Sequence, residues 1–249
     1  LGIGLDRPAP AARRPLSERC IDAGVILGAM LFLILPLALL FIKGAVGVPD
    51  LGAPVWFAAL RSLALALGAT LLCLCFALPL ATRWGELIAT LGIAVSPLVL
   101  GTGLFLIVRP YVNPFDVALG VTVCVNALMS LPFALRILRP EVQAVEQNFS
   151  HLSAALGLGA WGWVRWVMLP RLRRPLGFAA GLTAALSMGD LGVIALFGDA
   201  ERATLPLKLY QLMGSYRMDQ AAAAAVLLLA LSLGLFWLFD RVGRYGAQD

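Results

Sequence analysis

The chain has 249 residues, of which 61% are hydrophobic and 13% are charged, and its formal net charge is +5. Its mean hydropathy is +0.90. So few polar side chains cannot cover the surface of a soluble domain of this length, which excludes a water-soluble globular protein. The composition predicts a protein that crosses a membrane several times.

The chain is expected to begin with a linker and to continue as a helical bundle. Residues 1–20 are rich in Pro, Ala and Arg, which favours a cytosolic linker, and 21–249 should form one transmembrane domain. We also expect the polypeptide to continue upstream, a truncated sequence being the alternative.

Apolar runs of about 20 residues cross a hydrocarbon core of about 30 Å as helices. Six such runs predict an all-α fold, a polytopic bundle of six transmembrane helices: 21–42, 57–82, 87–108, 115–138, 176–197 and 221–239.

The basic residues predict the orientation of this bundle. With a cytosolic N-terminus, most of the 19 basic residues fall inside, and those left outside are Lys43, Arg61, Arg109, Arg202, Lys208 and Arg217. Because positive residues resist translocation, both ends of the chain and the loop 139–174 should be cytosolic. The positive net charge is then a topology signal and requires no nucleic acid. Contact of the loop arginines 171, 173 and 174 with anionic lipid is compatible with this interpretation.

Side chains that could support catalysis, redox chemistry or metal binding are sparse. The chain has one histidine, His151, and the pair Cys73 and Cys75 should point to different helix faces. The G-x-G-x-x-G match at 157–162 follows no strand, and no acidic residue lies about 20 positions later, so a dinucleotide site is excluded. No G-x-x-x-x-G-K-[ST] occurs in the sequence. We therefore expect no cofactor, and any ATP must be bound by another chain.

Residues 139–174 predict a cytosolic elbow between the fourth and fifth apolar runs. In 141–149 charged and apolar residues alternate in an amphipathic pattern, which is too short to cross a bilayer and suited to its surface. Ser150 is expected to cap a short helix that begins at His151. Gly157 should permit a turn that other residues resist. The tryptophans that follow are typical of a membrane interface: Trp161, Trp163 and Trp166.

This elbow resembles the cytosolic coupling loop of binding-protein-dependent ABC importer permeases. Residues 153–157 and 167–170 match the E-A-A, G and I-x-L-P pattern of that family at its spacing. The chain departs from the pattern at the leading acidic position, where it has His151, and this puts in doubt any salt bridge formed from there. The resemblance implies that the contact with an ATPase is made by Ser153, Ala154, Ala155, Gly157, Leu169 and Pro170.

A second resemblance, over the C-terminal third, is to bacterial thiamine permeases, whose chain fuses two six-helix halves. This sequence is similar to the second half, at residues 186–193, 195–198, 204–206, 209–211 and 214–217. The resemblance implies a type I ABC importer permease of the bacterial inner membrane that carries thiamine or its phosphate esters from periplasm to cytoplasm. It performs no chemistry itself, and the implied partners are a dimer of cytosolic ATP-binding subunits, a periplasmic substrate-binding protein and a second permease half upstream in the same polypeptide.

Other substrates and another class of transporter remain open. Ferric iron, a polyamine or an oxyanion are the alternative cargoes of an ABC importer. An ion-coupled secondary transporter is the alternative class, but it would need more ionisable residues inside the membrane than this chain offers. A membrane-embedded enzyme would need a converging nucleophile or metal site, and none is evident in the sequence.

Asp190 is the principal candidate for the substrate path. A carboxylate inside a membrane span is costly unless it faces a cavity or a partner. Thiamine carries a permanent positive charge, so Asp190 could supply a counter-charge, with Ser187 on the same helix face and Tyr210 or Tyr216 available for cation–π contact. The alternative is a helix break held by backbone amides, whatever the substrate. The polar segment 198–218 should then cap the path on the outside or form a solvated connection.

Overall fold

The computed structural model describes residues 16–81, 85, 96–157, 159–197 and 203–245. Within these ranges every regular element is a helix. Four helices are long and apolar enough to cross a membrane: α1 (Leu16–Gly44), α2 (Ala53–Leu80), α5 (Pro114–Ala155) and α11 (Met218–Tyr245). The expected all-α membrane bundle is therefore confirmed, whereas the total of six transmembrane helices stays a prediction.

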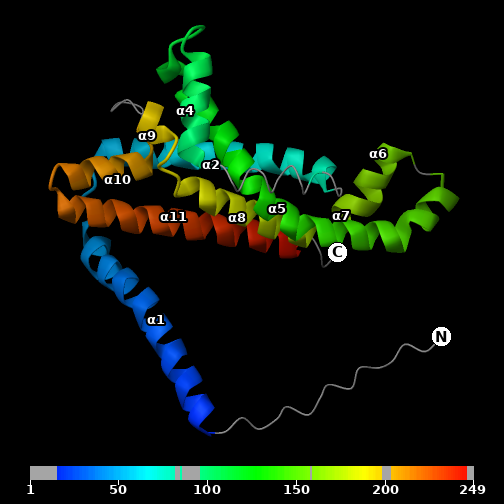
Figure 1. Cartoon of the computed structure of the whole chain (residues 1–249), viewed down its shortest axis with the longest axis horizontal. Coiled ribbons are helices and arrows are strands. Elements are labelled where there is room, and N and C mark those ends of the chain that lie inside the picture. The colour runs from blue at the N-terminus through cyan, green and yellow to red at the C-terminus, as the bar shows by residue number, and fades with distance from the viewer. Residues whose placement is uncertain (1–15, 82–84, 86–95, 158, 198–202, 246–249) are drawn as a thin grey trace.

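A shorter helix, α8 (Arg173–Met188), lies at the centre of the bundle and packs against α2, α5 and α11 (Figure 1). Its buried residues are mostly small. On α2, Ala69, Cys73 and Ala77 recur every four residues and are fully buried, so they form one face of the helix. Cys75 is exposed, which confirms that the paired cysteines point to different faces. Small side chains allow the backbones of membrane helices to approach closely, and van der Waals packing then holds them together.

The closest approach of α8 and α11 is made by glycines. A Cβ atom on Gly177 would lie 2.6 Å from the backbone oxygen of Phe239 and 2.7 Å from the Cα of Gly243. One turn further along α8, a Cβ on Gly181 would lie 2.9 Å from the backbone oxygen of Phe236. These contacts are too short for any side chain, so the spacing of the two helices depends on glycine at these positions.

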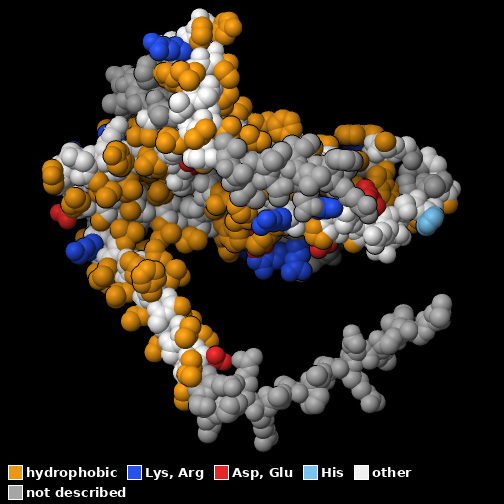
Figure 2. Space-filling view, viewed as in Figure 1, with side chains coloured by type: hydrophobic (Ala, Val, Ile, Leu, Met, Phe, Trp, Pro, Cys, Tyr) orange, Lys and Arg blue, Asp and Glu red, His pale blue; other side chains and the backbone are white. Residues whose placement is uncertain are grey.

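The first helix, α1, extends away from the bundle as a long apolar rod (Figures 1 and 2). None of its most hydrophobic window is buried against the rest of the described chain. It contacts α11 near its own C-terminal end, where a Cβ on Gly44 would lie 2.7 Å from the Cγ2 of Val226. A helix that is apolar on all sides and exposed is suited to lipid or to another membrane-embedded chain.

Two of the predicted spans differ from a single continuous helix. Of the span 87–108, the structure describes α4 (Pro97–Val108), which begins directly after the extended backbone of Ser96 (φ −68°, ψ 138°), and residues 86–95 lie outside the described part. The span 176–197 was expected to be one helix, but this is wrong. The helix α8 ends at Met188 and a turn leads to α9 (Ile194–Phe197). The carboxylate of Asp190 bonds a backbone N–H of this turn, which stabilises the break.

The elbow also differs from its prediction. Residues 141–149 do not form a separate surface segment, and Ser150 does not cap a new helix, because α5 is continuous over 42 residues. Most residues of this stretch are good helix formers, and the apolar side chains of Val142 and Val145 are buried within the protein. The amphipathic pattern therefore marks a face that packs on the bundle.

A short helix, α10 (Leu205–Gly214), lies against α2 and α11. Its first residues are buried, and the N–H of Leu205 donates a hydrogen bond of 2.8 Å to the Oγ of Ser62 on α2. Residues 198–202 lie outside the described part of the chain. The segment is thus anchored to the bundle at α10, and its expected role as a cap on the path stays a prediction.

Candidate substrate path and coupling loop

A cavity of about 400 Å³ lies between the start of α4, the middle of α5 and the end of α8. Apolar side chains make up much of its wall, including Met129, Phe133 and Leu186. Polar groups converge on it from two directions, Asn126 and Ser130 from α5, and Ser187 and Asp190 from the end of α8 and the turn after it. An apolar cavity with a few converging polar groups is typical of a small-molecule site.

The polar residues of α5 and α8 are linked across the cavity wall. The side-chain amide of Asn126 donates from Nδ2 to the Oγ of Ser187 at 2.9 Å and lies 3.4 Å from the backbone oxygen of the same serine. Asn126 and Ser187 are both buried. Their bond fixes the last turn of α8 against α5, immediately before the chain leaves the helix.

The two carboxylate oxygens of Asp190 lie in different environments. Its Oδ1 accepts a hydrogen bond of 3.0 Å from the N–H of Gly192 and so closes the turn after α8. Its Oδ2 is buried and has no hydrogen-bond partner among the residues that the structure describes. A buried oxygen without a partner is costly, and a residue that lines a cavity can recover that cost by binding a ligand. The alternative of a helix break held by backbone amides accounts for the contacts of the carboxylate with the N–H groups of Gly192 and Val193, but it gives the buried Oδ2 no hydrogen bond within the described part of the chain.

The other two residues of the expected path lie elsewhere. Tyr210 on α10 and Tyr216 in the turn after it are exposed, and neither is among the described residues that line this cavity. The structure thus brings Ser187 and Asp190 together and separates them from the two tyrosines. Asn126 and Ser130 were missed in the sequence. The signal that could have found them is their spacing of four residues within an apolar run, which places both on one helix face.

The predicted coupling loop is a helical hairpin at the end of α5. Gly157 has a φ of +63°, which confirms the turn expected there. The chain then returns along α5 through α6 (Ala160–Gly162), a π-helical segment η2 (Trp163–Met168) and α7 (Leu169–Arg171), as Figure 1 shows. A cation–π contact joins the two arms, because the Cζ of Arg171 lies 3.9 Å from the ring centroid of Phe149.

Apolar side chains are exposed around the tip of this hairpin. They include Leu152, Leu156, Trp161 and Leu169. Of the expected coupling residues, Gly157 lies at the turn and Leu169 and Pro170 on the returning arm, while Ala155 ends α5. The backbone of Ser153 and Ala154 belongs to α5, and their side chains lie outside the described part. An exposed apolar surface of this kind is suited to a protein partner.

Comparison with known proteins extends the likeness beyond these motifs. The chain is 37% identical over 241 residues to the thiamine transport system permease protein ThiP of Brucella abortus (strain 2308). It is 35% identical over 252 residues to the protein of the same name from Salmonella typhimurium. The chain is similar to bacterial thiamine permeases. This confirms the expected resemblance, and the aligned regions cover 90% and 94% of this chain.

The same comparisons show how much of each relative is matched. The aligned regions cover 44% and 47% of the Brucella and Salmonella proteins, so the chain spans about half the length of these relatives. A shorter similarity, 32% over 125 residues, is to the chloroplastic sulfate permease 2 of Chlamydomonas reinhardtii, and it covers 49% of this chain and 34% of that protein. No protein-family model matches the chain.

Proposed function

We propose that this chain is the transmembrane segment of a permease subunit in an ATP-driven ABC importer, and that its cargo is thiamine or a thiamine phosphate ester. The observation that carries the proposal is the similarity to thiamine permeases along 90% or more of the chain. Transport runs from the periplasm to the cytoplasm across the bacterial inner membrane. Both ends of this segment lie in the cytosol, in agreement with the distribution of basic residues.

ATP is bound and hydrolysed by a partner in this proposal. The helical hairpin around Gly157 contacts a dimer of cytosolic ATP-binding subunits, to which it offers the exposed apolar side chains of its tip. Closure of that dimer moves the hairpin, and the rigid packed helices transmit the movement to the bundle. A periplasmic binding protein delivers the cargo, and a second permease half completes the pathway. The match to about half of each relative is consistent with such a second half.

The cavity at Asp190 is the proposed point of contact with the cargo. The unpartnered Oδ2 offers negative charge, and the thiazolium ring of thiamine carries a permanent positive charge. Ser187 and Asn126 hold the turn that presents this oxygen. A transport site must bind its cargo weakly enough to release it, and one carboxylate oxygen in a mostly apolar cavity is suited to that requirement.

The test is uptake of labelled thiamine into proteoliposomes that contain the full-length permease and its ATPase subunit, with binding protein outside and ATP inside. We expect uptake that requires ATP and is lost in Gly157→Asp. Leu156→Ser should weaken binding of the ATPase subunit, whereas Met213→Ser, at an exposed apolar position on α10, should not. Uptake driven by an ion gradient without ATPase would contradict the proposal.

Two substitutions at Asp190 separate its roles. Asp190→Asn keeps an oxygen that can accept from the N–H of Gly192 and removes the charge, whereas Asp190→Ala removes both. If the carboxylate contacts the cation, both variants lose uptake, and Asp190→Asn retains normal thermal stability. If it only stabilises the turn, Asp190→Asn transports normally and Asp190→Ala is unstable. Asp219→Asn, at an exposed carboxylate in the first turn of α11, is the matched control.

The similarity to a sulfate permease favours an oxyanion as the second candidate cargo. That similarity covers 49% of this chain, about half the extent of the similarity to thiamine permeases. The unpartnered carboxylate oxygen in the cavity also opposes binding of an anion. Uptake of labelled sulfate in the same proteoliposomes, without uptake of thiamine, would support the proposed importer and show that its cargo is an oxyanion instead of thiamine.

A further inference from the structure

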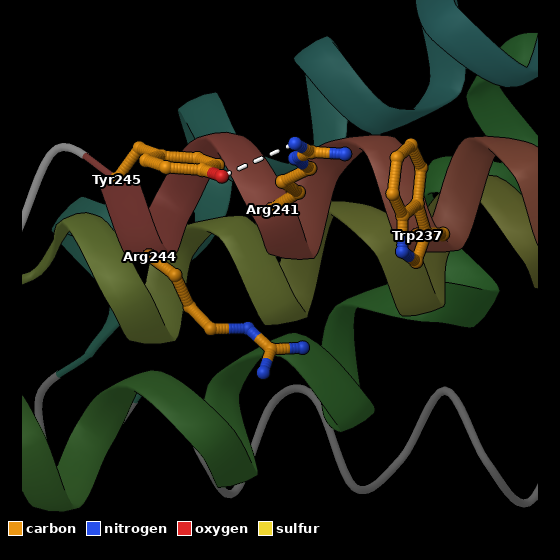
Figure 3. A pocket seen from close by; sticks show the side chains of 4 residues that line it. All are labelled: Trp237, Arg241, Arg244 and Tyr245. Atoms are coloured by element: carbon orange, nitrogen blue, oxygen red, sulfur yellow. Dashed lines mark hydrogen bonds between the residues drawn. The ribbon is translucent and has the colours of Figure 1, made fainter.

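The last turns of α11 form a second cavity, of about 510 Å³, at the end of the helix remote from α10 (Figure 3). Its lining consists of two aromatic and two basic residues: Trp237, Arg241, Arg244 and Tyr245. Figure 3 shows Arg241 on the same side of α11 as the two rings, whereas Arg244 extends from the other side. The cavity therefore combines an apolar wall with positive charge.

Arg241 is held by aromatic rings. Its Cζ lies 4.7 Å from the ring centroid of Trp237 and 5.2 Å from that of Tyr245, and its Nη2 donates to the Tyr245 hydroxyl at 3.1 Å. No described carboxylate pairs with it. The two rings fix the planar guanidinium in place and leave several of its N–H donors available.

The other basic residues at this end are neutralised or face elsewhere. Arg244 forms an ion pair with Asp240 one turn before it. Together with Arg171, Arg174 and Glu141, that pair lines an adjoining cavity of mixed charge between α5, α8 and α11. Arg241 therefore differs from Arg244, because no described carboxylate forms an ion pair with it.

The face of α11 that carries Arg241 is otherwise apolar and exposed. Leu233, Trp237, Arg241 and Tyr245 follow one another at intervals of four residues and so share a face. Leu233, Trp237 and Tyr245 are each more than half exposed. On a helix long enough to cross a membrane, such a face is directed toward acyl chains, and its terminal Trp, Arg and Tyr lie at the level of the head groups.

We propose that this cavity binds the phosphate group of an anionic phospholipid. The guanidinium of Arg241 donates to the phosphate oxygens in the planar arrangement that suits them. Trp237 and Tyr245 contact the glycerol and upper acyl region, where aromatic rings are favoured. Charge complementarity favours a phosphate group, and the continuous exposed apolar face of α11 favours a lipid over a soluble phosphate compound. This inference requires only that α11 spans the membrane, and it holds whatever cargo the permease carries.

The experiment is native mass spectrometry of the full-length permease in detergent, with added phosphatidylglycerol or phosphatidylcholine of identical acyl chains. We expect the wild-type protein to retain phosphatidylglycerol in preference to phosphatidylcholine. Arg241→Gln should weaken retention of phosphatidylglycerol about fivefold, as expected for one interfacial basic residue. Arg217→Gln, an exposed position near the other end of α11, makes the same change in charge and should have no effect.

Two further variants keep the test decisive if Arg241→Gln is poorly folded. Arg241→Lys keeps the charge but loses the planar donor group, so its preference for phosphatidylglycerol should be intermediate. Tyr245→Phe keeps the ring and should retain most of the binding. Equal losses in Arg217→Gln and Arg241→Gln would overturn the proposal, as would equal retention of the two lipids. If soluble glycerol phosphate competes as effectively as phosphatidylglycerol, the proposed lipid is wrong and the cavity binds a soluble phosphate compound. Thiamine uptake is not measured, so this proposal and the proposed function can fail separately.

Discussion

Asn126 on α5 and Ser187 on α8 are joined by a hydrogen bond of 2.9 Å across 61 positions of the sequence. Both side chains are buried, and the bond lies at the last turn of α8 before the chain breaks toward Asp190. Lipid provides no hydrophobic force that selects one helix register over another, so a specific polar contact can do so. The hydrogen bond between Asn126 and Ser187 therefore fixes α8 against α5 where both helices line the cavity.

The first prediction concerns the strength of this bond. Asn126→Ala and Ser187→Ala should each lower the free energy of unfolding by about 1 kcal/mol, because each leaves the other group without its partner. The double variant should lose less than the sum of the two. Unfolding in mixed micelles with increasing sodium dodecyl sulfate measures all three values. Thr102→Ala is the control, since its hydroxyl bonds only the local oxygen of Leu98 at an exposed position. Strictly additive losses would show that the bond contributes nothing.

The second prediction concerns the glycine contact between α8 and α11. Gly177→Ala places a methyl group 2.6 Å from a backbone oxygen of α11, which neither helix can accommodate without moving. We expect a loss of about 1–3 kcal/mol in the free energy of unfolding. Gly234→Ala on α11 has open space around it and should be neutral or stabilise by up to about 1 kcal/mol. Thermal unfolding in detergent compares the two, and equal melting temperatures would contradict the close approach.

The sequence predicted the membrane helices better than the points where they break. Apolar runs are sufficient to identify α1, α2, α5 and α11, because a bilayer demands long hydrophobic helices. The end of α8 could not be located in this way, since the residues on both sides of Asp190 are as apolar as a continuous helix requires. The break is stabilised by a hydrogen bond that the N–H of Gly192 donates to the carboxylate of Asp190, and hydropathy does not register such a bond.

The candidate site was predicted in part for a similar reason. Asp190 and Ser187 could be selected because polar residues are conspicuous inside an apolar run. Their partner Asn126 lies in a different helix, and only the packing of α5 against α8 brings the two together. The tyrosines were placed on the path because aromatic rings bind cations, but α10 packs on α2 and α11 and leaves Tyr210 exposed. That an aromatic ring can bind a cation does not determine where the fold places that ring.

The third prediction tests how α10 is attached. The N–H of Leu205 is buried and donates to the Oγ of Ser62, so Ser62→Ala leaves a buried donor without an acceptor. The cost should be about 1–3 kcal/mol, and the start of α10 should become more accessible. Hydrogen exchange at Leu205, followed by mass spectrometry, measures this locally. Ser215→Ala removes a hydroxyl that bonds only the preceding turn of α10 and should leave the exchange of Leu205 unchanged. Unaltered exchange in Ser62→Ala would mean that other contacts anchor the helix.

The fourth prediction concerns Gly157, where the hairpin reverses. A Cβ atom there would contact nothing within 4 Å, so any cost of substitution arises from the positive φ and not from crowding. Gly157→Ala should therefore lose about 1–2 kcal/mol, and Gly157→Asn should lose less, because asparagine tolerates the left-handed conformation. Thermal unfolding orders the variants, and binding of the proposed ATP-binding partner shows whether the hairpin keeps its shape. Gly159→Ala is the matched control, since Gly159 is equally uncrowded but has a φ of −67°. If the two alanine variants are equally stable, the left-handed turn is not what requires glycine at position 157, and the helical hairpin must be stabilised by its arms, including the contact of Arg171 with Phe149.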